Sequence, residues 1–328
     1  MSTEDDFTRL TDPYRRELLA HCYRMLGSVH DAEDLVQETY LRAWRGYGDF
    51  EARSSLRTWL YRIATRACLT ALESRERRVL PSGLGGPSDD PQIELAGRLD
   101  SVAWLTPIPD TMLGGGGDPT DPATIVGIRE STRLALIAAM QGLPPRQRAA
   151  LLLRDVLGWR ADEVAELLGT STASANSALQ RARLRVARVA PREDDIDHHA
   201  DVDASVLARF VAAFEHADIA TLAQLLREDV ELEMPPIPTW FAGRAAVLGF
   251  FAHRVLGNAV RHLVSTAANG FPATATYVHA SDTLLTAHSL QVLEIRDGGI
   301  AHIYAFLDPS LFAAFGLPST LPLAAVTP

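Results

Sequence analysis

Residues 31–44 read DAEDLVQETYLRAW, and residues 54–78 read SSLRTWLYRIATRACLTALESRERR. Apolar side chains in both stretches recur at spacings of three and four, which predicts two amphipathic helices. The predicted buried faces consist of Leu35, Val36, Thr39, Ala43 and Trp44 in the first, and of Leu56, Trp59, Leu60, Ile63, Ala67 and Leu72 in the second. A third helix, predicted over residues 4–27 and ending at Gly27, should complete a helical bundle.

The outer faces of the two central helices differ in charge. Asp34, Gln37 and Glu38 lie one turn apart on the first helix. The second helix carries a series of arginines, namely Arg57, Arg62, Arg66, Arg75, Arg77 and Arg78. This contrast indicates a protein partner for the acidic helix and nucleic acid for the basic one, although an ordinary bundle with solvated charges is the alternative.

A second motif lies at residues 158–188, which read GWRADEVAELLGTSTASANSALQRARLRVAR. Residues 161–168 predict a short helix, residues 169–171 a turn, and the residues from Thr172 onward a second helix, which together form a helix-turn-helix. The stripe of Ala175, Leu179, Ala182 and Val186 should face the first helix. Polar side chains then point outward, as in a helix that lies in a DNA major groove.

The two motifs together closely resemble regions two and four of the extracytoplasmic-function (ECF) sigma factors of the sigma-70 family, the promoter-recognising subunits of bacterial RNA polymerase. The resemblance implies that Asp34, Gln37 and Glu38 dock on the β′ clamp helices of core RNA polymerase, and that the β flap is a further contact. Asn176 and Ala178 stand where the commonest sigma pattern has Lys and Arg, so the base preference cannot be transferred.

The resemblance also implies two sets of promoter contacts. The minus-10 set, which captures a flipped base by stacking and edge hydrogen bonds, comprises Phe50, Arg53, Arg57, Trp59, Arg62 and Arg66. The minus-35 set comprises Ser174, Asn176, Ser177, Gln180, Arg181 and Arg183. Within it, the arginines should bind phosphates and the uncharged polar side chains should read bases.

The 328 residues carry a net charge of -10, yet the charge is unevenly spread. Residues 129–192 hold 11 Arg against 5 acids, whereas residues 193–328 hold 6 Arg against 16 acids. The basic segment coincides with the helix-turn-helix. An acidic N-terminus and the lack of long apolar runs predict a cytoplasmic protein that does not enter a membrane. Cys22 and Cys68 fall on apolar helix faces, so no metal site, disulfide or cofactor is expected.

Residues 81–128 are rich in glycine, proline and aspartate and predict a linker. Within it lies the apolar stretch VAWLTPIPD at residues 102–110, which resembles a W-L-x-P-x-P-D element in linkers of sigma factors that carry an extra C-terminal domain. Trp104, Leu105, Pro107 and Pro109 are its predicted contact residues. A local loop that covers a hydrophobic patch is the equal alternative.

Residues 203–328 predict an α+β domain. Helices are expected at residues 206–214, 219–226 and 244–255, and strands at residues 230–234, 261–267, 273–279, 286–295 and 300–307, with a hairpin turn at Asp297-Gly298. The order resembles the SnoaL-like (NTF2-like) cone, whose relatives hold small apolar ligands. Candidate cavity residues are Trp240, Phe241, Phe251, Tyr277, His279, His302, Tyr304 and Phe306.

The fold class is therefore multidomain: two all-α sigma domains, a region 2 bundle at residues 1–80 and a region 4 helix-turn-helix at residues 129–192, plus the α+β cone at residues 203–328. The expected function is promoter-specific transcription initiation without catalysis, with regulation by the C-terminal domain and a small apolar ligand as a further partner. The alternative is a cyclase, isomerase or hydrolase, for which acid/base groups would have to come from Asp282, His253, His279, His302 and Asp308.

Overall fold

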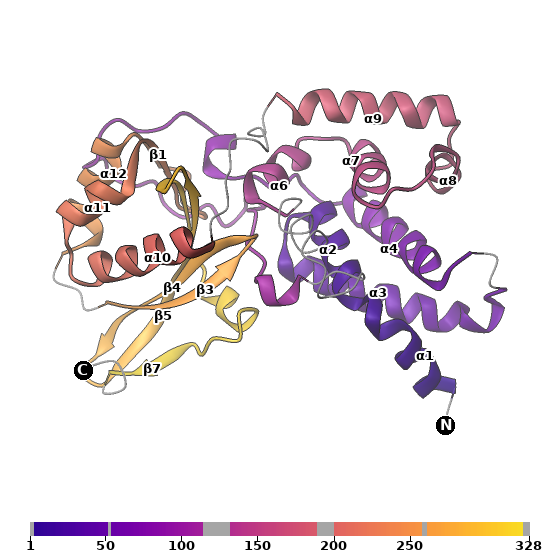
Figure 1. The fold of residues 1–328 in the computed structure, drawn as a ribbon, viewed down its shortest axis with the longest axis horizontal. Coiled ribbons are helices and arrows are strands. Elements are labelled where there is room, and N and C mark those ends of the chain that lie inside the picture. Colours follow the sequence, from indigo (N-terminus) through magenta and orange to yellow (C-terminus); the bar gives the residue numbers. More distant parts are fainter. Residues whose placement is uncertain (1–2, 52–53, 114–131, 189–199, 258–260, 324–328) are drawn as a thin grey trace. The chain divides into compact units, whose positions relative to one another are not determined.

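The computed structural model describes residues 3–51, 54–113, 132–188, 200–257 and 261–323. The chain divides into two compact units, one made of Met1–Arg78 and Asp110–Pro191 and the other of Val79–Pro109 and Arg192–Pro328. None of the described helices is long and apolar enough to cross a membrane. Figure 1 labels the elements of both units.

In the first unit, the described regular elements are all helices (Figure 1). Its helices are α1 Thr3–Thr11, α2 Arg15–Leu26, α3 Val29–Gly46, α4 Leu56–Glu73, α6 Leu134–Gln141, α7 Pro145–Leu151, α8 Ala161–Leu167 and α9 Thr172–Val186. Helix α2 ends at Gly27, which adopts the left-handed φ of 71° that stops a helix. The side chains of Ser28 and Ser55 cap the first turns of α3 and α4.

Three expectations for the bundle need correction. Of the residues predicted for the buried face of α4, only Leu60 and Ala67 are buried, while Leu56, Trp59, Ile63 and Leu72 are half-buried. The helix predicted over residues 4–27 is split into α1 and α2 by a 3-10 turn at Asp12–Tyr14, because Pro13 has no N–H to continue the helical ladder. Trp44, predicted to be buried, is 39% exposed and lies edge-on against Phe7, with ring centroids 5.2 Å apart. The other residues predicted for the α3 core face are buried.

Helices α8 and α9 form the predicted helix-turn-helix, and Ser171 caps α9 by accepting a hydrogen bond from the Ser174 N–H. Gly169 provides the left-handed residue, at φ 60°, that the tight turn requires. Before the helix-turn-helix, α7 is followed by a π-helical turn at Leu152–Val156. Helices α6 and α7 contact α2, and α7 also contacts α4. The two helix sets, α1 to α4 and α6 to α9, therefore belong to one packed unit.

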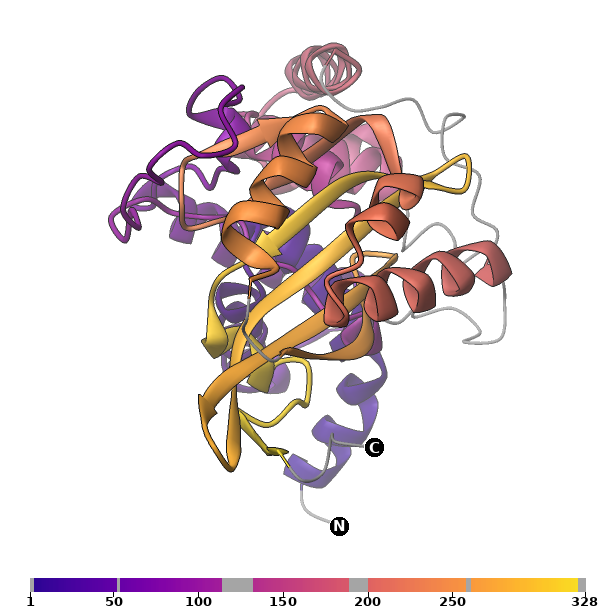
Figure 2. The ribbon, with the colours of Figure 1, turned by 90° about the vertical axis from the view of Figure 1, so that its left-hand side faces the viewer.

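The second unit is the predicted α+β domain (Figure 2). Its helices are α10 Ala200–Glu215, α11 Ile219–Leu225 and α12 Arg244–Phe250, and its strands are β1 Leu226–Glu233, β2 Trp240–Ala242, β3 Arg261–Ala268, β4 Phe271–Ser281, β5 Leu284–Arg296, β6 Gly299–Phe306 and β7 Thr320–Pro322. The sheet order is β2-β1-β6-β5-β4-β3, with β7 on β5, and β1 and β6 run parallel. Short β2 and β7 were not predicted from the sequence.

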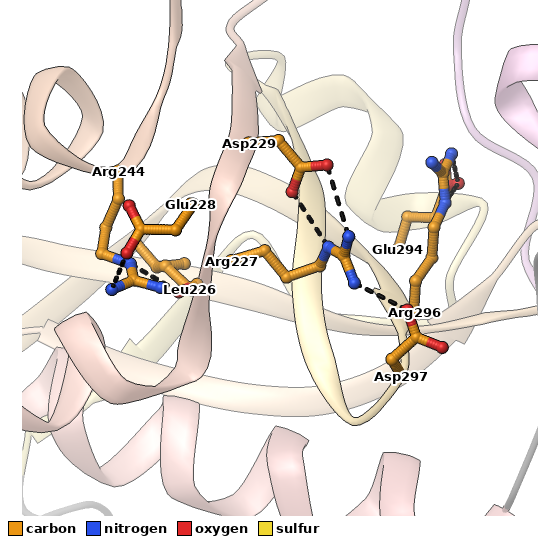
Figure 3. A network of polar contacts seen from close by, with 8 residues as sticks. All are labelled: Leu226, Arg227, Glu228, Asp229, Arg244, Glu294, Arg296 and Asp297. Carbon is orange, nitrogen blue, oxygen red and sulfur yellow. Dashed lines mark hydrogen bonds and ion pairs between the residues drawn. The ribbon is translucent and has the colours of Figure 1, made fainter.

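The hairpin between β5 and β6 turns at Asp297-Gly298, as predicted, with φ of 51° and 73°. Figure 3 shows how β1 is tied to this turn: Arg227 forms ion pairs with Asp229 at 2.9 Å and with Asp297 at 2.7 Å. Nearby, Arg244 donates to the Leu226 carbonyl at 2.8 Å. These pairs are solvent-exposed, so each contributes at most about 1 kcal/mol.

The predicted linker is only partly a linker, because Val79–Pro109 belongs to the second unit. Val79 pairs with Trp104, Ser88 with Phe241 and Pro109 with Ala268 as isolated β-bridges. The first bridge closes the segment on itself, and the other two join it to β2 and β3 of the sheet. Residues 114–128 of the predicted linker lie outside the described residues.

Candidate functional site

Helix α3 presents a polar face to solvent. Asp34 and Gln37 are exposed, and Glu38 forms an ion pair with Arg42 at 2.8 Å. Leu41, one turn further along the same face, is 52% exposed. Leu41 was not among the residues predicted for this face, although its spacing from Asp34 and Glu38 places it there. The face thus combines acidic side chains with an exposed aliphatic one.

An aromatic cluster lies where the chain passes from α3 to α4. The Phe50 ring centroid is 4.8 Å from that of Trp59 and 6.5 Å from that of Tyr47. All three side chains are half-buried, so part of each ring faces solvent. Half-exposed rings can stack on an unpaired base. Arg53, predicted to act beside them, lies outside the described residues.

The arginines of α4 are engaged to different degrees. Arg57 binds the buried carboxylate of Glu17 at 2.9 Å and lies over the Tyr61 ring. Burial acts to lower the pKa of Arg57, but the Glu17 carboxylate and Tyr61 outweigh it, and the pKa is raised. Arg62 pairs with both carboxylate oxygens of Glu166 on α8 at 3.0 Å, and Arg66 is exposed. Two of the predicted minus-10 arginines therefore have carboxylate partners within the unit.

Helix α9 separates an apolar from a polar face. The buried side chains are Ala175, Leu179 and Ala182, and the exposed ones include Ser174, Asn176, Ser177, Gln180 and Arg181. Arg183 is exposed as well but binds Asp155 through two hydrogen bonds of 2.6 and 2.9 Å. That carboxylate raises the pKa of Arg183. The exposed surface is mostly polar, with Leu184 as an exposed apolar side chain one turn beyond Gln180, and a polar helix face of this kind can enter a major groove.

A buried guanidinium joins the two helix sets of the first unit. Arg148 of α7 is 3% exposed and donates to the Met25 carbonyl of α2. It also donates to the Gln141 side chain at 2.6 Å and to the Leu143 carbonyl at 3.2 Å. Burial, together with the positive charge of Arg77, lowers the pKa of Arg148 to about 10. Arg148 thus satisfies helix-end carbonyls that would otherwise be buried without a donor.

The second unit encloses a cavity of about 280 Å³. Its lining consists of Leu95, Phe214, Leu232, Met234, Ile237, Phe250, Phe251, Arg254, Val255, Arg261, Thr276, Val278, His288, Ser289, Gln291, Ile303, Ala305 and Leu307. Most of the lining is apolar, while the cationic and amide side chains come from α12 and its continuation and from β3 to β5. Burial and the charge of Arg261 lower the pKa of His288 below 6.5.

Three family descriptions match the chain: Sigma-70 region 2 at residues 10–78, Sigma-70 region 4 at residues 133–186, and the SnoaL-like domain at residues 207–303. The ECF RNA polymerase sigma factor SigG of Mycobacterium tuberculosis is 52% identical over 320 residues, which cover 96% of this chain and 85% of the relative. The chain belongs to the extracytoplasmic-function sigma factors. This membership confirms the predicted family and the predicted role as an RNA polymerase sigma factor.

The fold agrees with this assignment. The crystal structure of the Mycobacterium tuberculosis ECF sigma factor SigJ covers 93% of this sigma factor and is itself covered over 97%, with a TM-score of 0.60 and 26% sequence identity. The predicted fold class, two helical sigma domains followed by a SnoaL-like α+β domain, is therefore confirmed.

Of the residues predicted for the cavity of this sigma factor, Phe251 lines it and the others lie elsewhere. Tyr277 donates to the Pro318 carbonyl at 2.8 Å, and His302 stacks on Tyr304 with ring centroids 3.8 Å apart. Trp240 donates to the Gly85 carbonyl, His279 is exposed, and Phe241 packs on Phe250 without lining the cavity. The cavity face of β4 and β6 carries their neighbours in sequence, such as Thr276, Val278, Ile303 and Ala305.

A shift of one residue explains this error, because successive strand side chains point to opposite faces of the sheet. The usual sequence signal for choosing the face is the alternation of apolar and polar residues. Strand β5 is buried at almost every position of its second half, so it offers no such alternation. The sheet is covered on its second face too, where Phe312 packs on Tyr277 at 5.2 Å.

The W-L-x-P-x-P-D element of this sigma factor is buried in the second unit. Trp104 donates to the Leu99 carbonyl at 2.9 Å, and Leu105, Pro107 and Pro109 are buried. Next to them, the Ile108 N–H donates to the Asn269 side chain at 3.0 Å. The element therefore packs on the SnoaL-like domain, as a loop that covers a hydrophobic patch.

One group of described side chains has donor atoms close enough to hold a metal ion. These are Glu231, Glu233 and His302, whose potential ligand atoms lie within 4.8 Å of one another. The two nitrogens of His302 face the carboxylates of Glu231 at 3.3 Å and Glu233 at 3.0 Å, and Glu233 also accepts from the Ser82 N–H. Although the Nε2 of His302 lies 3.0 Å from Glu233, it makes no hydrogen bond to a described residue.

Proposed function

We propose that this sigma factor directs promoter-specific initiation, with region 2 recognising the minus-10 element, region 4 the minus-35 element, and the SnoaL-like domain regulating both. The observation that carries the proposal is the exposed polar face of α9, backed by buried Ala175, Leu179 and Ala182. Because the apolar stripe fixes the helix on the first unit, only the polar face can reach DNA. Asn176, Ser177 and Gln180 are proposed to read bases there, with Ser174 beside them.

The polymerase contact is proposed to be the α3 face formed by Asp34, Gln37, Glu38 and Leu41. Its acidic groups suit a basic helical partner such as the β′ clamp helices, and charge complementarity would guide the encounter. Leu41 adds apolar area that becomes buried only in a complex. Single exposed leucines are common on protein surfaces, so the exposure of Leu41 alone does not indicate a contact. The support comes from the position of Leu41 on the same helix face as the acidic side chains.

The minus-10 contact is proposed to involve Phe50 and Trp59 by stacking, with Arg57, Arg62 and Arg66 near the DNA backbone. Arg62 is paired with Glu166 and Arg57 with Glu17. DNA binding therefore has to exchange carboxylate partners for phosphates. The Arg62–Glu166 pair joins region 2 to region 4 within one unit, so such an exchange at Arg62 would loosen their contact.

Regulation rather than catalysis is proposed for the SnoaL-like domain. The enzyme alternative needs an acid/base pair in the cavity, but Asp282, His253, His279, His302 and Asp308 are not among its lining residues. The described lining offers one histidine and two arginines, without a carboxylate. A small, largely apolar ligand fits this lining better than a proton-transfer reaction does.

The proposed polymerase contact is tested by binding of core RNA polymerase to the Asp34→Arg/Glu38→Arg variant. Both side chains are at the surface, so helicity should be retained and affinity should fall at least tenfold. Asp282→Arg, an exposed acid of the second unit, is the matched control for added positive charge. Equal affinity of the double variant and the control would remove the docking assignment.

A further inference from the structure

The polar wall of the cavity contains an amide without a full set of partners. Gln291 is 6% exposed, and its Nε2 lies 3.4 Å from the Thr276 hydroxyl, while its Oε1 has no hydrogen-bond partner among the described residues. An unsatisfied buried polar atom costs about 1–3 kcal/mol. When the amide turns over, Oε1 accepts from Thr276 and the Nε2 donor points to a bound acceptor. The wall is therefore suited to a ligand with hydrogen-bonding oxygens.

The same wall is positively charged. The charge comes from Arg254 and Arg261, and the described lining includes no carboxylate. His288 also lines the cavity and, because its pKa is lowered, adds a hydrogen-bonding ring rather than a charge. The rest of the cavity is formed by phenylalanine and aliphatic side chains. Its volume of about 280 Å³ is almost twice the roughly 150 Å³ that accepts a benzene ring. The chemistry that matches is a compact apolar body of one or two rings with an anionic group at one end.

Part of the wall comes from the segment that joins the two sigma regions in sequence. Leu95 lines the cavity, and residues 91–99 around it, here called the strap, are otherwise mostly exposed. Hydrogen bonds rather than burial hold the strap. The Leu99 N–H donates to the Pro236 carbonyl at 3.0 Å, and the Ala96 N–H to the Thr239 hydroxyl at 3.3 Å.

Two of the anchors of the strap are themselves cavity residues. Arg254 donates to the carbonyls of Gln92 at 3.2 Å and Ile93 at 3.0 Å. The Leu307 carbonyl accepts from Arg98 at 2.9 Å. A ligand in the cavity would contact Leu95 directly and Arg254 and Leu307 from the other side. The hydrogen bonds that hold the strap are exposed and bury little area, so they open more readily than those of the core. This opening would let a ligand enter the cavity.

We propose that the cavity binds a small apolar carboxylate, held at Arg261, His288 and Gln291, and that its binding locks the strap closed. The inference rests on the proposed regulatory role of the SnoaL-like domain. A ligand shifts an equilibrium only by its difference in affinity for the two states. Here the difference arises because Leu95 completes the apolar wall only when the strap is closed. The occupied cavity thus restrains the chain that runs from region 2 to region 4.

The ligand class is tested by calorimetric titration of the full chain with 1-naphthoate and with 1-naphthylmethanol, an uncharged molecule of similar shape. We expect 1-naphthoate to bind at least tenfold more tightly, and Arg261→Gln to remove that preference. Arg209→Gln, an exposed arginine on α10, is the matched control and should keep it. Absence of 1-naphthoate binding, or equal affinity for both probes, overturns the proposal.

Coupling to the strap is tested by amide hydrogen exchange of the full chain, without polymerase or DNA. At a 1-naphthoate concentration of about 100 Kd, openings that release the ligand should become up to about 100-fold rarer, so exchange at Ala96 and Leu99 should slow strongly. Leu95→Ala should weaken both the binding and the protection, because it removes the apolar contact. Binding that leaves exchange at Ala96 and Leu99 unchanged overturns the coupling. Neither experiment depends on transcription, so a failure here is distinct from failure of the proposed sigma regions.

Discussion

At the scale of single residues, the helical unit contains buried polar side chains whose ionisation is linked to folding. His21 of α2 is 1% exposed, and its Nε2 lies 2.9 Å from the Thr65 hydroxyl of α4. Burial, and then the positive charge of Arg24, lower the pKa of His21 to about 3. An unfolded histidine has a pKa near 6.5, so the unfolded chain binds this proton more readily than the folded one.

Acid should therefore destabilise region 2 through His21. As the pH falls below about 6.5 towards 3, the protonated unfolded state gains about 1.4 kcal/mol per pH unit over the folded state. Between pH 6.5 and 5, wild type should lose about 2 kcal/mol more than a His21→Gln variant in urea unfolding followed by helical signal. His279→Gln, at an exposed site, should retain the wild-type slope. Parallel pH profiles for wild type and His21→Gln would contradict the buried, neutral histidine.

At the scale of the elements, α9 is expected to divide its work between affinity and specificity. Arg181→Ala should weaken binding to every DNA sequence and reduce the salt dependence by about one unit, because one phosphate contact is lost. Asn176→Ala and Gln180→Ala should instead change the preferred bases. Selection from a pool with a randomised minus-35 region measures both effects, and an identical consensus from all variants would show that these roles are wrong.

The elements also show what could be predicted from sequence. Helices α3, α4, α8 and α9 were predictable because each has one buried and one solvated face, so the period of 3.6 is visible in the residues. The cavity residues on β4 and β6 were not, because both faces of the sheet are covered. Tyr277 and Thr276 are both buried, and only the packing of α10 and α12 determines that Thr276 faces the cavity.

At the scale of the whole molecule, the chain order and the structural units differ. The segment Val79–Pro109 follows region 2 in sequence but folds with the SnoaL-like domain. Its glycine and proline content predicted a linker, and the segment does lie between the two sigma regions in sequence. Composition could not show that the segment packs on a surface more than 100 residues away in the chain. Leu105 and Ile108 are 0% exposed, so this segment depends on the later domain for its burial.

Removal of the C-terminal domain should therefore release this segment. In a chain that ends at residue 192, the buried apolar side chains of Val79–Pro109 lose their cover, and limited proteolysis within residues 79–109 should become at least tenfold faster than in the full chain. The helical signal of α1 to α4 should persist, which distinguishes local release from general unfolding. Equal cleavage rates in the two chains would mean that the segment does not depend on the SnoaL-like domain.

At the same scale, the central proposal is that this chain gives core RNA polymerase its promoter specificity through α3 and α9. Run-off transcription with purified core enzyme, on a template selected by the full chain, tests this most directly. Wild type and Asp282→Arg should yield a discrete transcript, whereas Asp34→Arg/Glu38→Arg should reduce its yield at least tenfold. Asn176→Ala should also reduce the yield on this template, but it should reduce the yield less on a template that was selected with the Asn176→Ala variant. A transcript of equal yield from wild type and Asp34→Arg/Glu38→Arg, or none from wild type, would contradict the account.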